Sequence, residues 1–247
     1  MIIKESTPPA QKRAERLRNE VVATFCDTIK STGSHPALFG EFTRIPPGEY
    51  YPKLLNMMWY GIFKAGRPKE DTDREYIAFR KVFDLIGNAD IETLLGFGVG
   101  RYGHNAEEHM RSMKICLNQI PKEPQLVMPV MNGGFFFGAV VYNHMKMHNL
   151  ALGPAFVGHE RICSSGVYSY NPETVYIHSN DLETIKSHLQ YPMLLVDDTL
   201  DKGITSGTIA KTLYDIGAKS VGLAVETDIA TYNSPECKRY FGLARMD

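Results

Sequence analysis

The stretch LLVDDTLDKGITSGT, residues 194–208, decides how the second half of this chain folds. With Met193 before it, the stretch begins as a nearly continuous apolar run, which is typical of a parallel strand buried on both faces. The segment that follows, 206–217, carries apolar residues at helical spacing and ends in Gly217. The stretch therefore predicts a strand, a short loop and a helix.

The same alternation of strands and helices extends on both sides of this stretch. A helix is expected over 133–149, where glycines precede an apolar segment. Further strands are expected at 125–131, 154–162, 174–179 and 220–227. Apolar strands that alternate with helices predict an α/β domain built on a Rossmann-like parallel sheet.

The first half of the chain has a different pattern, in which apolar residues recur at helical spacing. Helices are expected at 11–31, 54–66, 73–87 and 105–119. The segment QIPKEPQ, 119–125, has two prolines and two charges and is expected to be a linker. We therefore expect an all-helical N-terminal domain, 1–118, and an α/β domain, 119–247.

Composition limits the class of protein. The chain has 247 residues, 43% of them hydrophobic, and a net charge of −1, so no strong basic field indicates a nucleic-acid partner. The four cysteines are widely spaced, which argues against a zinc site or a disulfide framework. Neither a signal peptide nor an apolar run of about 20 residues is evident. These features predict a soluble, cytoplasmic protein without a membrane segment.

Acidic side chains and an anion site are expected side by side at the end of the strand at 193–198. Asp197 and Asp198 end this strand, where ligands bind in open parallel sheets, and neighbouring strand residues point to opposite faces. The helix that follows offers backbone N–H groups and a partial positive charge to a phosphate. Thr205 and Ser206 add hydroxyl groups. A phosphorylated sugar with free hydroxyls would use both halves of such a site.

The segment LLVDDTLDKGIT resembles the phosphoribosyl diphosphate (PRPP) signature of type I phosphoribosyltransferases, although Thr199 and Lys202 depart from the usual residue types. The resemblance implies that Asp197 and Asp198 hold the ribose hydroxyls, helped by Mg²⁺. The ion would be bound through PRPP without a dedicated protein ligand, and Asp197 or Asp198 is the candidate for a direct contact. It implies a catalytic role in proton transfer for Asp201. It implies 5′-phosphate binding by Lys202, Gly203, Ile204, Thr205, Ser206 and Thr208. The alternative is a buried strand and a capped helix that bind nothing.

The family has a second strand–loop–helix element, which binds the diphosphate, and the segment 126–141 resembles it. The corresponding loop is Met131, Asn132, Gly133 and Gly134, and the resemblance implies a cis peptide bond between Met131 and Asn132. A simple βα turn is the alternative. Between the two loops, 159–179 matches a mobile lid of the family or an ordinary polar hairpin.

The resemblance covers about half of the chain and implies transfer of a phosphoribosyl group from PRPP to a nitrogen acceptor, most often a nucleobase, with release of diphosphate. Glu226 and Thr227 stand where purine-using members often carry a lysine, which weakens a purine as acceptor. The alternative is a PRPP- or nucleotide-binding regulatory protein that acts through its helical domain and a protein partner. A homo-oligomer is also compatible with the sequence.

Overall fold

The computed structural model describes residues 9–33, 59, 61–63, 66–90, 92–94, 117–131, 133–164, 167–200, 203–228 and 242–244. The chain divides into two compact units, Met1–Met110 and Arg111–Asp247, and each is described by itself. Among the described residues, no helix has both the length and the apolar character that a membrane crossing requires.

Two long amphipathic helices form the described core of the first unit. Helix α1 spans Pro9–Thr32 and helix α4 spans Lys69–Gly87, which confirms the helices expected at 11–31 and 73–87. The buried residues of α1 recur every three or four positions, as one face of a helix requires: Ala14, Leu17, Val21, Phe25 and Ile29. The helices expected at 54–66 and 105–119 lie mostly outside the described residues.

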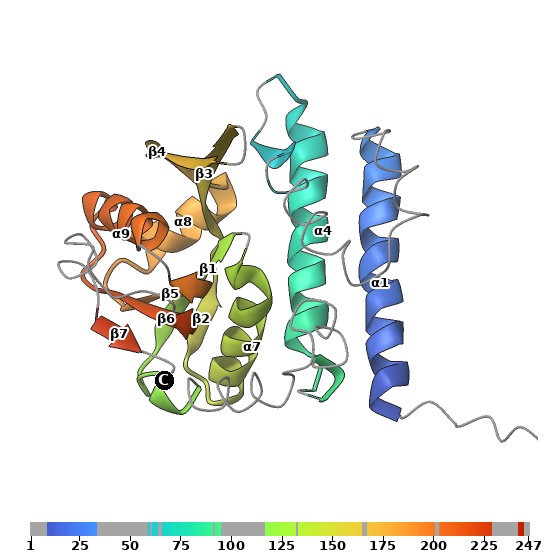
Figure 1. The fold of residues 1–247 in the computed structure, drawn as a ribbon, viewed down its shortest axis with the longest axis horizontal. Helices are drawn as coiled ribbons and strands as arrows, with labels where there is room; N and C mark the ends of the chain where they lie inside the picture. The colour runs from blue at the N-terminus through green and yellow to red at the C-terminus, as the bar shows by residue number, and fades with distance from the viewer. Residues whose placement is uncertain are drawn as a thin grey trace, which may run out of the picture. The chain divides into compact units, whose positions relative to one another are not determined.

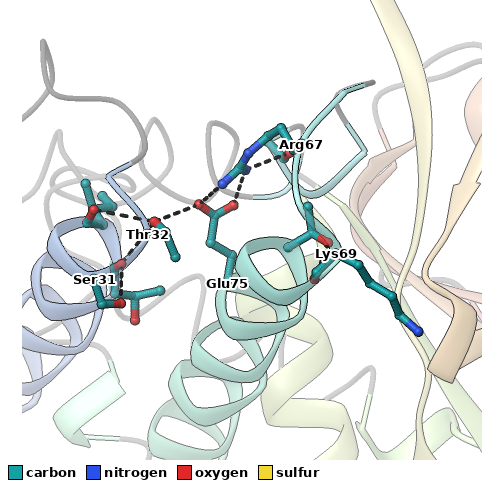
Figure 2. A network of polar contacts seen from close by, with 9 residues as sticks. Ser31, Thr32, Arg67, Lys69 and Glu75 are labelled. Atoms are coloured by element: carbon teal, nitrogen blue, oxygen red, sulfur yellow. Dashed lines mark hydrogen bonds and ion pairs between the residues drawn. The ribbon is translucent and has the colours of Figure 1, made fainter.

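A buried carboxylate links the end of α1 to the beginning of α4 (Figure 2). Glu75 is fully buried, and its two oxygens accept hydrogen bonds from the guanidinium of Arg67 at 2.5 and 2.7 Å. The hydroxyl of Thr32 donates to the same carboxylate at 3.3 Å, and Arg67 also donates to the carbonyl of Gly61 at 2.8 Å. The pKa of Arg67 is raised by its hydrogen bond to Glu75. The paired charges make this burial tolerable.

One mixed, mostly parallel sheet organises the second unit, which establishes the α/β class. Its described strands are β1 (Gln125–Met131), β2 (Ala151–Pro154), β3 (Val157–Ser164), β4 (Val167–Ile177), β5 (Met193–Leu200), β6 (Val221–Asp228) and β7 (Gly242–Ala244). The strand order is β4-β3-β1-β5-β6-β7, and β2 also pairs with β1. All pairs are parallel except β3 with β4. The antiparallel β4 departs from the purely parallel sheet that the sequence predicted.

Helices cover both faces of this sheet (Figure 1). Helix α7, Gly134–Met147, lies on one face, and α8, Ser179–Ser187, and α9, Ile204–Ile216, lie on the other. Gly138 of α7 packs against Pro129 of β1 so closely that a Cβ would come within 2.7 Å of the proline ring. On the opposite face, Ile209 of α9 joins a continuous apolar core with Leu195 of β5. Covering helices on both faces explain why the central strands are apolar throughout.

The segment expected to be either a lid or a hairpin contains the antiparallel strands β3 and β4. Their pairing continues to Ser164 and Val167, so only two residues join the strands. Antiparallel pairing of β3 with β4 is compatible with both alternatives. The strand pairing also extends β4 well before residue 174, where the sequence predicted it to begin.

Candidate functional site

The start of α7 lies against the end of β5, at a point where the chain reverses its direction across the sheet. After β1 the chain passes through α7 to β2, which pairs with β1 on one side. After β5, the neighbour of β1 on the other side, the chain passes through α9 to β6, farther away. In open α/β sheets such a switch point is where ligands bind, beyond the carboxyl ends of the strands. Both segments singled out in the sequence lie at this edge.

The two aspartates at the end of β5 occupy opposite faces of the sheet. Leu195 lies in the core beneath α9, and because alternate strand residues share a face, Asp197 lies on that side as well. Asp197 is only 5% exposed, and its Oδ1 accepts the backbone N–H of Asp198 at 2.9 Å. Asp198 is half-buried and lies on the α7 side. The two carboxylates therefore lie on opposite faces of the sheet, as strand alternation predicted.

Two glycines bring the start of α7 against the end of β5. A Cβ on Gly133 would lie 1.8 Å from Oδ1 of Asp198, and a Cβ on Gly134 would lie 2.0 Å from the carbonyl oxygen of Val196. Real Cβ atoms do not approach other atoms so closely, so both positions require glycine for this packing. The contact places the Asp198 carboxylate directly beside the first turn of α7.

Both helices at this edge begin at a glycine. Gly133 precedes α7, and Gly203, with φ 70°, precedes α9 in a left-handed conformation that glycine adopts at little cost. The first hydrogen bond within α9 runs from the N–H of Gly207 to the carbonyl of Gly203 at 2.8 Å. The N–H groups of residues 204–206 therefore have no carbonyl four residues back within the helix. Such a helix end offers several donors and a partial positive charge to an anion.

The hydroxyl residues of α9 differ in their surroundings. Thr205 and Ser206 are 9% and 3% exposed, and the Ser206 hydroxyl donates to the carbonyl of Gly203 at 3.4 Å. The Thr208 hydroxyl donates to the carbonyl of Ile204 at 2.8 Å, so it already has a partner within the helix. Ile204 is 37% exposed. Thr205 and Ser206 are thus the first-turn hydroxyls, while Thr208 lies farther along the helix.

Several predicted site residues lie outside the described part of the chain. Met131 ends β1 and is buried, but Asn132 and the peptide bond between the two are not described. Asp201 and Lys202 lie outside the described residues as well, and so does the side chain of Thr199.

The sequence analysis singled out neither His159 nor the pair His144 and His148. His159 follows Gly158, the register partner of Met131, and its side chain is only 2% exposed at the same edge of the sheet. Its position two residues after the core residue Val157 was the signal for burial. His144 lies in the last turn of α7 and His148 is the C-cap of that helix, and their ring centroids are 4.8 Å apart. Within the described residues, however, no group of three or more potential ligands could hold a metal ion.

Comparisons with known proteins find little similarity in sequence or structure. No protein-family model and no curated protein matches the chain. Among solved structures, the chain is similar to the crystal structure of a hypothetical protein from Neisseria gonorrhoeae with bound ppGpp. The two are 12% identical, with 56% of this chain and 84% of that chain covered and a TM-score of 0.34. The function must therefore be argued from this chain's own residues.

Proposed function

We propose that this chain is a phosphoribosyltransferase that transfers the phosphoribosyl group of PRPP to a nitrogen acceptor, with a nucleobase as the expected class. The observation that carries the proposal is the contact between Gly133 and Asp198. It joins two segments, about 65 residues apart in the sequence, that separately resemble the diphosphate loop and the PRPP signature. The finer fold assignment, a Rossmann-like type I phosphoribosyltransferase fold, and a cytoplasmic location belong to the same proposal.

Each part of the site would bind one part of PRPP. The first turn of α9, with the N–H groups of residues 204–206 and the hydroxyl of Thr205, suits the 5′-phosphate. The start of α7 and residues 131–134 suit the diphosphate for the same reason. Asp197 and Asp198, between the two, would accept hydrogen bonds from the ribose hydroxyls. The helix ends would thus attract the two charged ends of one substrate.

The carboxylate of Asp198, which lies beside the first turn of α7, also fits a magnesium ion bound together with the substrate, because Mg²⁺ is usually held by one or two carboxylates and the phosphate oxygens of the substrate. When bound, Mg²⁺ neutralises charge on the diphosphate and so makes it a better leaving group. The protein's own task would be to hold PRPP in one orientation while the acceptor approaches its C1 atom.

The proposed reaction forms one bond and breaks another. The acceptor nitrogen donates its lone pair to C1, and the bond from C1 to the diphosphate oxygen breaks, with its electron pair leaving on the diphosphate. The nitrogen loses its proton to a base, a role that the family resemblance assigns to Asp201. Positive charge develops on the ribose at the transition state, so the nearby carboxylates of Asp197 and Asp198 would stabilise it.

A regulatory protein that binds PRPP or a nucleotide without transferring it is the second candidate. The observation that favours it is the first unit itself, whose helices α1 and α4 belong to the half of the chain that the resemblance does not cover. Lys202 also favours it, because this residue, like Thr199, departs from the usual PRPP signature and stands where the resemblance places the 5′-phosphate.

Measuring diphosphate release separates these candidates. The full chain is incubated with PRPP, Mg²⁺ and each member of a panel of purine and pyrimidine bases. Release that depends on a base supports the transferase. PRPP binding without release in the presence of any base favours the regulatory protein. Absence of PRPP binding contradicts both.

Two substitutions test the assignment of residues. Asp198→Asn removes a charge beside the ribose, and Thr205→Ala removes a hydroxyl beside the 5′-phosphate. A hydrogen bond to a charged group contributes about 1.5–3 kcal/mol, so each variant should bind PRPP at least about 10-fold more weakly by calorimetry. Asp215→Asn and Thr212→Ala, both farther along α9, are matched controls that should bind normally. Normal affinity of both site variants would refute the assignment.

A further inference from the structure

A groove runs along the surface of the two-helix core of the first unit. Its volume is about 570 Å³. Each helix contributes residues that recur three or four positions apart, and such residues lie on one face of a helix. The α1 side consists of Glu20, Ala23, Thr24, Asp27, Thr28 and Ser31, and the α4 side consists of Arg74, Ile77, Ala78, Lys81 and Leu85. All of these residues belong to one unit, so the groove does not depend on how the two units are placed.

The two sides of the groove are chemically opposite. The α1 side carries the acids Glu20 and Asp27, of which Glu20 also pairs with Arg16 at 2.9 Å, and otherwise only small side chains. The α4 side carries the bases Arg74 and Lys81 and the larger apolar side chains. Ile77 is 64% exposed, so it offers a large apolar side chain to a molecule that packs on the groove.

The helices run in opposite directions, and one side-chain hydrogen bond sets their register. The Thr32 hydroxyl near the end of α1 contacts the Glu75 carboxylate near the start of α4, at 3.3 Å. Both helices rise about 1.5 Å per residue, so residues at equal distances from this contact lie at the same height. Asp27 is five residues before Thr32, and Arg80 is five residues after Glu75. Asp27 therefore lies at the height of Arg80 and its neighbour Lys81. By the same count, Ile77, two residues after Glu75, lies at the height of the turn of α1 between Thr28 and Ser31.

We propose that this groove is the interface of a homodimer, in which a second copy of the chain packs face to face about a two-fold axis parallel to the helices. That axis exchanges α1 and α4 without changing their level. Asp27 then faces the partner's Lys81, and Ile77 faces the small side chains around the partner's Thr28. Every contact occurs twice, as an isologous interface requires. The groove is therefore complementary to a second copy of itself in both charge and side-chain size.

Charge reversal with mixing tests the interface. Sedimentation equilibrium of the unmodified chain should give a mass twice that of one 27.8 kDa chain as concentration rises. Asp27→Lys alone sets lysine against lysine in both symmetric contacts, and Lys81→Glu alone sets acid against acid, so each variant should be monomeric. An equal mixture restores both pairs, because the lysine introduced in one variant meets the glutamate introduced in the other, and the remaining pair is native. The mixture should therefore return to the dimer mass.

Matched substitutions outside the groove complete the experiment. Asp84→Lys on α4 and Lys12→Glu on α1 change the same charges at exposed positions and should leave the dimer intact. Ile77→Asp should abolish the dimer independently of the charge pair. Unchanged circular dichroism in all variants shows that the fold is retained, since every substituted residue is on the surface. An unmodified chain that stays monomeric, or a dimer that survives both charge reversals, would overturn the proposal.

Discussion

Replacing Gly133 by alanine perturbs the candidate site at its closest internal contact. The added Cβ would lie 1.8 Å from Oδ1, 2.2 Å from Cγ and 2.6 Å from Oδ2 of Asp198. Non-bonded heavy atoms prefer a separation of about 3.5 Å, so the carboxylate has to move by more than about 1 Å. Because these atoms form the end of a side chain, Asp198 can rotate away while the backbone stays in place.

The free energy of unfolding should change little in this variant. Gly133 has φ −75° and ψ −49°, a helical conformation that alanine adopts without strain. Alanine at such a position stabilises a protein by about 0.4–1 kcal/mol through the unfolded chain, which offsets part of the cost of moving Asp198. A displacement of about 1 Å at a reacting site, by contrast, lowers activity about 100-fold. Function should therefore be lost without loss of the fold.

The assay compares PRPP affinity and diphosphate release with stability in urea for three alanine variants. Gly134→Ala would bring a Cβ within 2.0 Å of the backbone oxygen of Val196, and Gly138→Ala within 2.7 Å of Pro129. Overpacking of this kind costs about 1–3 kcal/mol, so these two variants should be less stable. Only Gly133→Ala should lose PRPP binding while keeping wild-type stability. A Gly133→Ala variant that binds PRPP with unchanged affinity would refute the role given to the contact with Asp198.

Two further predictions concern stability. Glu75→Gln leaves the guanidinium of Arg67 without its carboxylate in a mostly buried place, so the free energy of unfolding in urea should fall by about 3 kcal/mol. A fall smaller than the error of the measurement would contradict the importance of this pair. The pKa of His144 is lowered from 6.5, first by burial and then by the charge of His148. The unfolded chain therefore binds the proton more readily, and stability should fall as pH drops from 6.5 toward the lower folded pKa. His144→Asn should reduce that slope, and an unchanged slope would argue against the shift.

Apolar runs in the sequence were sufficient to locate the central strands, because β1 and the first four residues of β5 are buried on both faces and are almost entirely apolar. The expected bounds of β1, 125–131, are those of the structure. β5 continues two residues beyond Asp198, since its pairing with β6 extends to Leu200 and Asp228. Nothing in the polar sequence after the aspartates indicates that extension, which depends on the neighbouring strand.

Elements with few buried side chains were missed. Helix α8 buries only Asp181 and Ile185, so it has no apolar stripe, and its N-cap is the unusual His178, which accepts the N–H of Asn180 at 3.4 Å. The four residues of β2 and the three of β7 are held by pairing with distant strands. Helix α9 begins at Ile204 rather than near Ser206, because Gly203 in a left-handed conformation starts it in place of a hydroxyl cap.

The site shows the same division between local and tertiary information. Strand alternation alone predicted that Asp197 and Asp198 lie on opposite faces of the sheet. That Gly133 approaches Asp198 depends on the adjacency of β1 and β5, which the order of elements along the chain does not specify. The buried His159 likewise belongs to the site edge only because β3 pairs with β1.

The most direct test of the proposed function is diphosphate release from PRPP in the presence of Mg²⁺, measured with and without each base, for the unmodified chain and for Asp198→Asn. The proposal predicts release that requires a base and that falls at least about 10-fold in the variant, while Asp215→Asn behaves as the unmodified chain. The result that would contradict it is a folded protein that releases no diphosphate with any base, whether or not it binds PRPP.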